Sequence, residues 1–249
     1  MGLSPTNCPH TNLGVWKVDA LTVAKSGNAT RMGEAAAMKL VRSKTSVPVP
    51  KVFNAYIVEE TNDPCILMEF VEGDVLRDVW DDMTHDEKAS IVSQLKGFMD
   101  ELRSIKGEFI GAVDETPCVD RIFEGNSSRY GPYGNEAEFH EGLIAAMKIS
   151  QENVWVDMVA EFIRAMPKHE IVLTHSDLAP RNIIVRGGKV VAILDWEYHG
   201  FYPAYWEYVK ACYRPDWSSG WMKERVVERI MQQYTLEHAV LLHTRDIVW

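Results

Sequence analysis

The sequence predicts an α+β fold of two lobes: a small antiparallel sheet with one helix in residues 1–71, and a mainly helical lobe in residues 72–249. Runs of β-branched and aromatic residues, separated by turn residues, fill the first lobe. Apolar residues recur at helical spacing over most of the second. A Gly187-Gly188 pair between two β-branched runs adds a hairpin, because a two-residue hairpin turn needs φ > 0 at both central positions.

The first lobe should begin with a hairpin of two short strands, 15–18 and 21–25, that turns at Asp19-Ala20. An alanine-rich helix is expected over 31–42, with Pro48 and Pro50 beyond its end. Two further strands are expected at 52–58 and 65–71, separated by turn-forming residues. The result is a small sheet with one helix.

The second lobe should contain several helices. Thr84 and Glu87 have the spacing of a capping box, which predicts a helix start, and apolar residues follow at helical spacing. Two more helices are expected at 135–149 and 151–166, the second ended by Pro167.

The Gly187-Gly188 hairpin should bring two polar side chains together. Pairing Arg186 with Lys189 makes Asn182 face Ile193 and Asp195 face Pro180. Asn182 and Asp195 would then lie at the same end of the hairpin, about 7 Å apart as diagonal neighbours. Asp177 enters that end from the preceding loop. Two oxygen ligands and a further carboxylate are what a Mg²⁺-assisted phosphoryl transfer requires.

These residues carry a family resemblance. The pattern His175-x-Asp177-x-x-x-x-Asn182 followed by Asp195 resembles the catalytic and metal loops of the protein-kinase fold. Residues 175–182 and 193–197 are more similar to its small-molecule branch, the aminoglycoside-phosphotransferase-like and choline-kinase-like proteins, with fungal members nearest. The resemblance covers nearly the whole chain, so it implies a protein-kinase-like two-lobe fold.

The resemblance also implies roles for these residues and the cofactors ATP and Mg²⁺. Asp177 would orient or deprotonate the acceptor hydroxyl, and Asn182 and Asp195 would hold Mg²⁺. Glu197 would be an additional carboxylate on the metal side, since this branch often carries an acid two residues after the metal aspartate. His175 would support the loop rather than react.

The first lobe supplies the candidates for nucleotide binding. Lys25 ends a strand and Glu34 opens the following helix, and the resemblance implies that Lys25 contacts the α- and β-phosphates while Glu34 holds it. The alternative is an exposed lysine, and an acid favoured at a helix N-terminus by the macrodipole. Residues 68–73 resemble the hinge between the lobes, where backbone groups of Glu69 and Val71 would meet adenine.

One departure from the kinase pattern concerns the phosphate-covering loop. Only residues 1–14 precede the strand at Val15, they contain no GxGxxG, and Pro5 and Pro9 interrupt any strand there. We therefore expect an N-terminally truncated lobe that covers ATP poorly. Three functions stay open: a phosphotransferase acting on a small-molecule hydroxyl, a nucleotide-independent enzyme on the same scaffold, and a pseudokinase-like binding protein. The fungal resemblance implies a place in secondary metabolism for the enzymes.

Composition narrows the choice of partners. A net charge of −10 disfavours nucleic acid, whose phosphates need a basic surface, and is compatible with a cationic substrate. No apolar run approaches the ~20 residues of a membrane helix. No signal peptide is recognised, and the four cysteines show no metal-binding spacing. We expect a cytoplasmic protein with a small-molecule substrate, no nucleic-acid or membrane partner, and an oligomeric state that the sequence does not indicate.

The acceptor site has candidate walls in the stretch 118–133. In the resembled branch a helical insert of the second lobe lines the acceptor pocket. The alternative, that these side chains cap the core of that lobe, is at least as well supported. The candidates are Arg121, Phe123, Arg129, Tyr130 and Tyr133.

Overall fold

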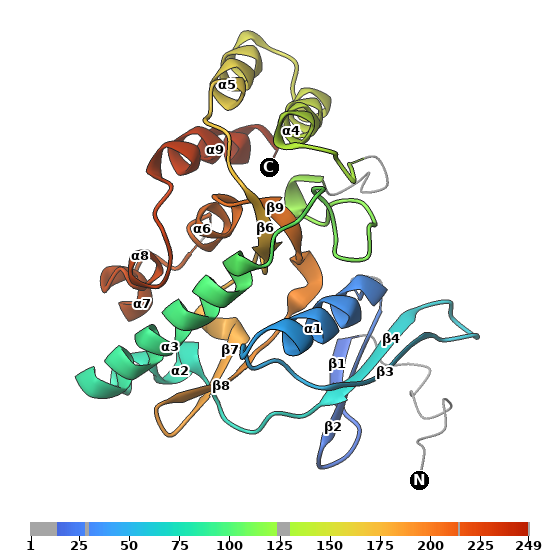
Figure 1. Ribbon diagram of the computed structural model, residues 1–249, viewed down its shortest axis with the longest axis vertical. Helices are drawn as coiled ribbons and strands as arrows, with labels where there is room; N and C mark the ends of the chain where they lie inside the picture. The colour runs from blue at the N-terminus through green and yellow to red at the C-terminus, as the bar shows by residue number, and fades with distance from the viewer. Residues whose placement is uncertain (1–13, 28–29, 124–129, 214, 249) are drawn as a thin grey trace.

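The computed structural model describes residues 14–27, 30–123, 130–213 and 215–248, and it confirms the predicted α+β fold. A four-stranded antiparallel sheet, with strand order β1-β2-β4-β3, lies at the N-terminal end of the molecule, and α1 packs against β3 and β4 (Figure 1). These elements are β1 (Gly14–Lys17), β2 (Thr22–Ser26), α1 (Met32–Lys44), β3 (Val52–Ile57) and β4 (Pro64–Glu69).

The chain leaves this sheet at Glu69 and enters a second one at β5 (Asp74–Val75), which pairs with β7 (Ile183–Arg186). Gly73 makes this crossing possible. Its φ is +158°, and a Cβ atom there would lie 2.6 Å from the carbonyl oxygen of Val185. No other residue could approach β7 so closely, so Gly73 fixes where the connecting segment meets the hairpin.

The remainder of the described chain is mainly helical. The capping box at the start of α3 (His85–Ser104) is present: the Glu87 N–H donates to Thr84 Oγ1 (3.3 Å) and the Thr84 N–H donates to Glu87 Oε2 (2.9 Å). The other elements are α2 (Leu76–Val79), η2 (Trp80–Asp82), η3 (Arg121–Phe123), α4 (Glu136–Ser150), α5 (Val154–Arg164), β6 (Ile171–Thr174), η5 (Pro180–Asn182), β8 (Lys189–Ile193), η6 (Trp196–Tyr198), β9 (Gly200–Pro203), α6 (Trp206–Ala211), α7 (Gly220–Lys223), α8 (Val226–Ile230) and α9 (Thr235–Val248).

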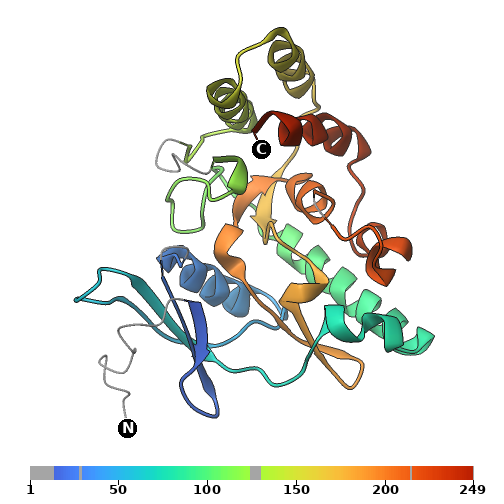
Figure 2. The same cartoon turned by 180° about the vertical axis from the view of Figure 1, so that it is seen from behind.

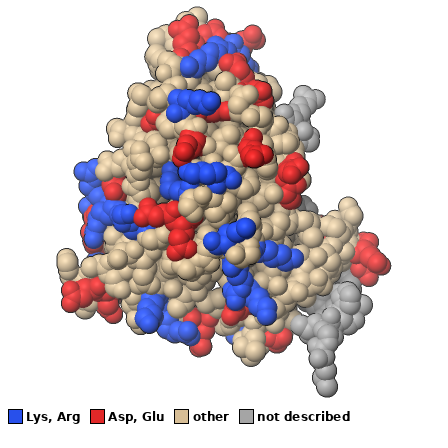
Figure 3. Space-filling view, in the orientation of Figure 1, with Lys and Arg blue, Asp and Glu red and all other residues tan. Residues whose placement is uncertain are grey.

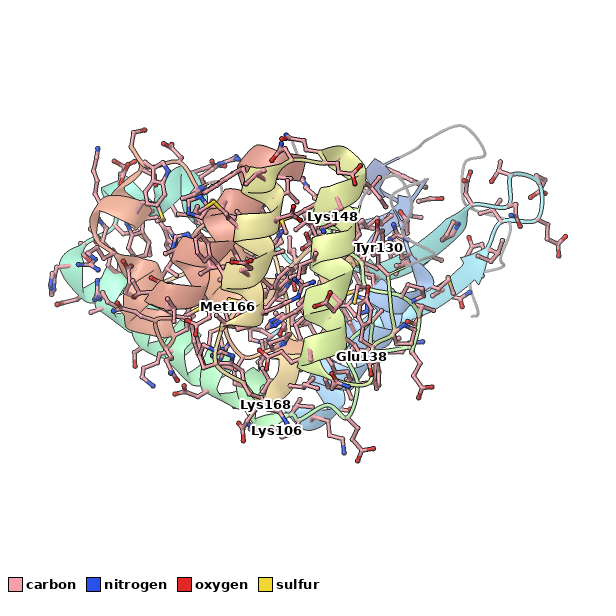
Figure 4. All side chains as sticks on the ribbon, turned by 90° about the horizontal axis from the view of Figure 1, so that it is seen from above. Lys106, Tyr130, Glu138, Lys148, Met166 and Lys168 are labelled. Carbon is pink, nitrogen blue, oxygen red and sulfur yellow. The ribbon has the colours of Figure 1, made fainter. Side chains whose placement is uncertain are left out.

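Two large apolar clusters, and a small third one that includes Ala24 and Cys65 of the first sheet, hold the described elements together. The larger one includes Met38 and Ile66 from the first sheet and its helix, and Leu95 and Ile193 from the helical part, so the packing is continuous across residue 71. The second lies under α4 and α5, which run side by side with Glu138 and Lys148 near opposite ends of α4 (Figure 4). Helix α5 is amphipathic, and the side chains that face this second cluster are Val156, Val159, Ala160 and Ile163.

The β7–β8 hairpin differs from its predicted register. Arg186 faces Lys189 and Val185 faces Val190, as expected, but Ile183 faces Ile193 because the register shifts within the hairpin. The prediction that Asn182 faces Ile193 and Asp195 faces Pro180 is therefore wrong by one residue.

A bulge at Val191 is the physical reason for this shift. Val190 and Ala192 both have strand partners, so the pairing skips the residue between them. Val190, Ala192 and Ile193 are all buried, while Val191, the residue that the pairing skips, is half-buried.

On the face shown in Figure 3, Lys and Arg side chains are interspersed with Asp and Glu. Among the described residues, none of the helices combines the length and the apolar character that a membrane crossing would need.

Candidate functional site

Lys25 is the centre of the first group of predicted site residues. Its Nζ atom lies 2.9 Å from Glu34 Oε2, 2.7 Å from Asp195 Oδ1 and 3.6 Å from Glu197 Oε2. Strand β2 supplies the lysine and α1 supplies Glu34, while Asp195 and Glu197 lie in the turn after β8. These segments meet because α1 packs against η6, beside the end of the hairpin (Figure 2). The structure thus brings together four of the predicted residues.

This group contains more negative than positive side chains. The side chain of Lys25 is 12% exposed and that of Glu34 only 1%. Burial alone would lower the pKa of Lys25, but the carboxylates of Glu34 and Asp195 outweigh it and raise that pKa. Burial raises the pKa of Glu34 to about 7, although Lys25 opposes this shift. Burial, and then the neighbouring Asp195, raise the pKa of Glu197. One lysine therefore faces three carboxylates.

Asp177 and Asn182 form the second group, in the loop that precedes β7. The amide Nδ2 of Asn182 donates to Asp177 Oδ2 (2.8 Å) and to the Asp177 carbonyl oxygen (2.9 Å). Arg181 Nη2 donates to Asp177 Oδ1. The Leu194 N–H donates to the Asn182 carbonyl oxygen (2.7 Å), so Asp195, the next residue, is anchored beside this group. Asp195 itself has φ +64°, an unusual conformation for a non-glycine residue.

His175 supports this loop, as the resemblance implies. Its Nδ1 accepts from the Asp177 N–H (3.1 Å), and its Nε2 is 2.9 Å from the Leu194 carbonyl oxygen, to which it donates in that tautomer. The ring is fully buried, with Trp196 packed edge-on against it. Both ring nitrogens are thus engaged in positioning the two polar loops.

Glu207 of α6 is a positioning residue that sequence reasoning missed. Its Oε2 accepts the N–H groups of His175 (2.6 Å) and Ser176 (3.3 Å), and the residue is only 2% exposed. A buried carboxylate thereby pairs backbone groups that would otherwise be unsatisfied. Glu207 lies 32 residues beyond His175, so no short sequence motif connects the two. The one indication in the sequence is a charged residue on a helix face that is otherwise apolar.

The predicted hinge residues Glu69 and Val71 lie at and just beyond the end of β4. The Glu69 N–H donates to the Lys51 carbonyl oxygen (2.9 Å), and its side chain accepts from the Lys51 N–H (3.1 Å). The Val71 N–H has no hydrogen-bond partner among the described residues.

A cavity of about 340 Å³ opens beside Asp177. Of the predicted acceptor walls only Arg121 lines it. Phe123 and Tyr130 stack on each other in the second core cluster, with ring centroids 4.6 Å apart, so packing is their observed role. Tyr133 packs against that cluster too, and Arg129 lies outside the described residues. Sequence reasoning missed three basic side chains of the lining, Arg77, Arg181 and Lys210.

The donor set fits a divalent cation, although the described residues contain no group of three His, Cys, Asp or Glu side chains arranged as a metal site. The predicted set combines the amide oxygen of Asn182 with the carboxylates of Asp195 and Glu197. All are oxygen donors, which Mg²⁺ prefers. Since a single lysine faces three carboxylates, the site has an excess of negative charge that a divalent cation would neutralise.

The expected truncation of the phosphate-covering loop concerns residues 1–13, which lie outside the described part of the chain.

Comparison with known proteins identifies the family. A family model described as the phosphotransferase enzyme family (APH) matches residues 20–242. The chain belongs to this family. Solved members share its fold: APH(4)-Ia is 15% identical with a TM-score of 0.61, over 96% of this chain and 83% of the other. A mutant of that enzyme in ternary complex with ADP and hygromycin B is also 15% identical, with a TM-score of 0.58, over 91% of this chain and 79% of that one. The predicted protein-kinase-like fold is confirmed.

The curated relatives match this chain over only part of their own length. Altered inheritance of mitochondria protein 9 of the yeast Komagataella phaffii is 28% identical over 154 residues, which is 52% of this chain and 25% of that protein. The trifolitoxin immunity protein of Rhizobium leguminosarum bv. trifolii is 31% identical over 100 residues, 37% of each chain. The chain thus matches about a quarter to a third of the length of these relatives.

Proposed function

We propose that this chain is an ATP- and Mg²⁺-dependent phosphotransferase that acts on a hydroxyl group of a small molecule. The contact between Lys25 and Asp195 (2.7 Å) carries the proposal, because it joins a strand lysine to a carboxylate beside the Asp177–Asn182 pair. A phosphoryl-transfer site needs both a cation for the phosphates and a base for the acceptor. Membership of the phosphotransferase enzyme family supports the same reaction class.

In this proposal Asp177 accepts the hydroxyl proton as the acceptor oxygen bonds to the γ-phosphorus and the bond to ADP breaks. Asn182 and Arg181 hold the carboxylate in place by their hydrogen bonds. Each carboxylate oxygen has a further lone pair, so these bonds leave room for the hydroxyl proton. Asp177 therefore needs no movement to act as the base.

The nucleotide would lie against the first sheet. Lys25, oriented by Glu34, would contact the α- and β-phosphates, and the backbone at Glu69 and Val71 would meet adenine. The Val71 N–H, which has no partner among the described residues, supports this assignment as a donor. We infer that residues 1–71 and 72–249 act as two lobes with the nucleotide between them. ADP in a complex of a solved relative supports nucleotide use.

Asn182, Asp195 and Glu197 would hold Mg²⁺. When bound, the metal would neutralise charge on the transferring phosphate. In its absence Lys25 alone opposes the three carboxylates, so metal binding should also relieve repulsion between Asp195 and Glu197.

Calorimetric titration with ATP, with and without Mg²⁺, tests this proposal. We expect saturable binding that requires Mg²⁺ and that Lys25→Ala weakens at least tenfold. Binding without γ-phosphate transfer to any acceptor would favour the pseudokinase-like alternative. No nucleotide binding at all would favour a repurposed cleft. A cytoplasmic location and a role in secondary metabolism stay predictions.

A further inference from the structure

The cavity beside Asp177 is basic, in contrast to the protein as a whole. Its described lining contains four cationic side chains, Arg77, Arg121, Arg181 and Lys210, against two carboxylates, Asp177 and Asp216. The whole chain carries 26 basic and 36 acidic residues. The ratio is thus reversed where the acceptor of the proposed reaction would bind.

The arginines retain capacity for a ligand. Arg77 is 60% exposed and its Nε donates to Asp78, while Arg181 is 47% exposed and donates to Asp177. A guanidinium group has five N–H donors, so each can hold an anion while keeping its present partner. Helix α2, which carries Arg77, packs against η5, which carries Arg181. The two side chains therefore approach the cavity from adjoining elements.

Lys210 is less available to a ligand than Arg77 and Arg181 are. Its Nζ lies 2.8 and 3.0 Å from the two carboxylate oxygens of Asp120, and the pair is buried. Arg121 also lines the cavity, and its Nε donates to Tyr198 Oη (3.1 Å). Tyr198 belongs to η6, the turn that follows Asp195. Arg121 therefore connects the cavity wall to the proposed metal loop.

We propose that the acceptor is an anionic hydroxyl compound, bearing a carboxylate or phosphate that Arg77, Arg121 and Arg181 recognise. The proposal rests on the proposed phosphotransferase function and names its substrate class. Arginine suits this role because its planar fork binds carboxylate and phosphate with two parallel hydrogen bonds. A polycationic aminoglycoside would instead meet three arginines around the base. Apolar side chains in the same lining, including Leu178, Trp221 and Met222, favour an acceptor with an apolar body.

Probes that share one carbon skeleton but carry different charges test this proposal by calorimetry without nucleotide. The probes are 3-phenyllactate (anionic), 3-phenyl-1,2-propanediol (neutral) and phenylalaninol (cationic), each with a hydroxyl and a phenyl group. Glycerol 3-phosphate against glycerol forms the second arm, which separates phosphate from carboxylate recognition. We expect at least tenfold tighter binding of one or both anionic probes than of their matched counterparts, weakening with salt.

Variants locate the binding. Arg77→Gln, Arg121→Gln and Arg181→Gln should each raise the Kd of the anionic probe at least fivefold, with no change for the neutral probe. Arg186→Gln, an exposed arginine of β7 outside the cavity, is the matched control and should leave the Kd unchanged.

Equal or tighter binding of the neutral or cationic probes, or no saturable binding of either anionic probe, would overturn the proposed substrate class. So would anion binding that survives all three arginine substitutions. Because these titrations contain no ATP, they are independent of the Mg²⁺-ATP titration that tests the phosphotransferase function. Failure of the one is therefore distinguishable from failure of the other.

Discussion

The Nζ atom of Lys25 lies 2.7 Å from Asp195 Oδ1, although 170 residues separate the two in the chain. This contact links β2 of the first sheet to the turn after β8, and Glu34 and Glu197 complete the surroundings of the lysine. Lys25 is therefore the cation that the first sheet contributes to the proposed site, and it also contacts the proposed metal ligands Asp195 and Glu197. Its charge can be tested separately from the base and from the metal ligands.

Lys25→Ala should abolish ATP-dependent turnover, because charge-assisted contacts to phosphate are the strong ones. The substitution also leaves three carboxylates facing one another, so thermal unfolding must be followed beside activity. Lys96→Ala, an exposed lysine of α3, is the control and should behave as the wild type. Full turnover that needs no nucleotide and persists in Lys25→Ala would refute the kinase assignment.

Asp177→Asn should lower kcat by about 10²–10⁴-fold while leaving the fold intact, because it removes the proposed proton acceptor. The fold should survive because the asparagine carbonyl can still accept from Asn182. Asp157→Asn, an exposed carboxylate of α5, is the matched control for loss of one charge. Steady-state kinetics and circular dichroism check this result. Near-normal kcat in folded Asp177→Asn protein would mean that this residue has another role.

Asp195→Ala and Asn182→Ala should shift the Mg²⁺ dependence of activity to higher concentration, because each removes an oxygen ligand of the proposed metal site. Asn182→Ala should in addition lower kcat at saturating Mg²⁺, since it releases Asp177 from its hydrogen bond. Activity measured against Mg²⁺ concentration separates the two effects. An unchanged Mg²⁺ response in both variants would contradict the metal assignment.

Glu34 should make stability depend on pH in the metal-free protein. Burial raises its pKa from 4.5 to about 7, so the folded state holds the proton more tightly than the unfolded chain does. The contribution of Glu34 to the free energy of unfolding should then fall by about 3 kcal/mol as pH rises from about 4.5 to about 7. His199, whose pKa burial lowers to about 4, acts in the opposite direction, so the contribution of Glu34 is measured as a difference between variants.

Glu34→Gln should remove this pH dependence, whereas Glu108→Gln, at an exposed position, should keep it. Urea unfolding at several pH values measures the difference. A wild-type profile parallel to that of Glu34→Gln between pH 4.5 and 7 would show that Glu34 does not titrate there.

Glu207→Leu should destabilise the catalytic loop, because the N–H groups of His175 and Ser176 lose their acceptor. Each buried N–H left unpaired costs about 1–3 kcal/mol. Glu207→Gln should recover most of this stability, since its side-chain oxygen can still accept both bonds. Equal unfolding free energies for Glu207→Leu and the wild type would contradict the positioning role.

Short sequence patterns were sufficient to predict several helices, turns and loops of this protein. The capping box at Thr84, the hairpin turn at Gly187-Gly188 and the helix after Arg31 depend on neighbouring residues, so the sequence alone predicted them. The spacing from Asp177 to Asn182 likewise fixes a loop whose two polar side chains contact each other. Short-range hydrogen bonds and backbone preferences are sufficient in these cases.

Tertiary packing decided the remainder. The bulge at Val191 interrupts a pairing that the turn at Gly187-Gly188 alone would have continued, and the basic lining of the cavity depends on Arg77 and Arg181 reaching the same cavity from separate elements. Glu207 reaches His175 from a helix 32 residues further along the chain. Such contacts follow from the burial of surfaces distant in sequence, and no local pattern encodes them.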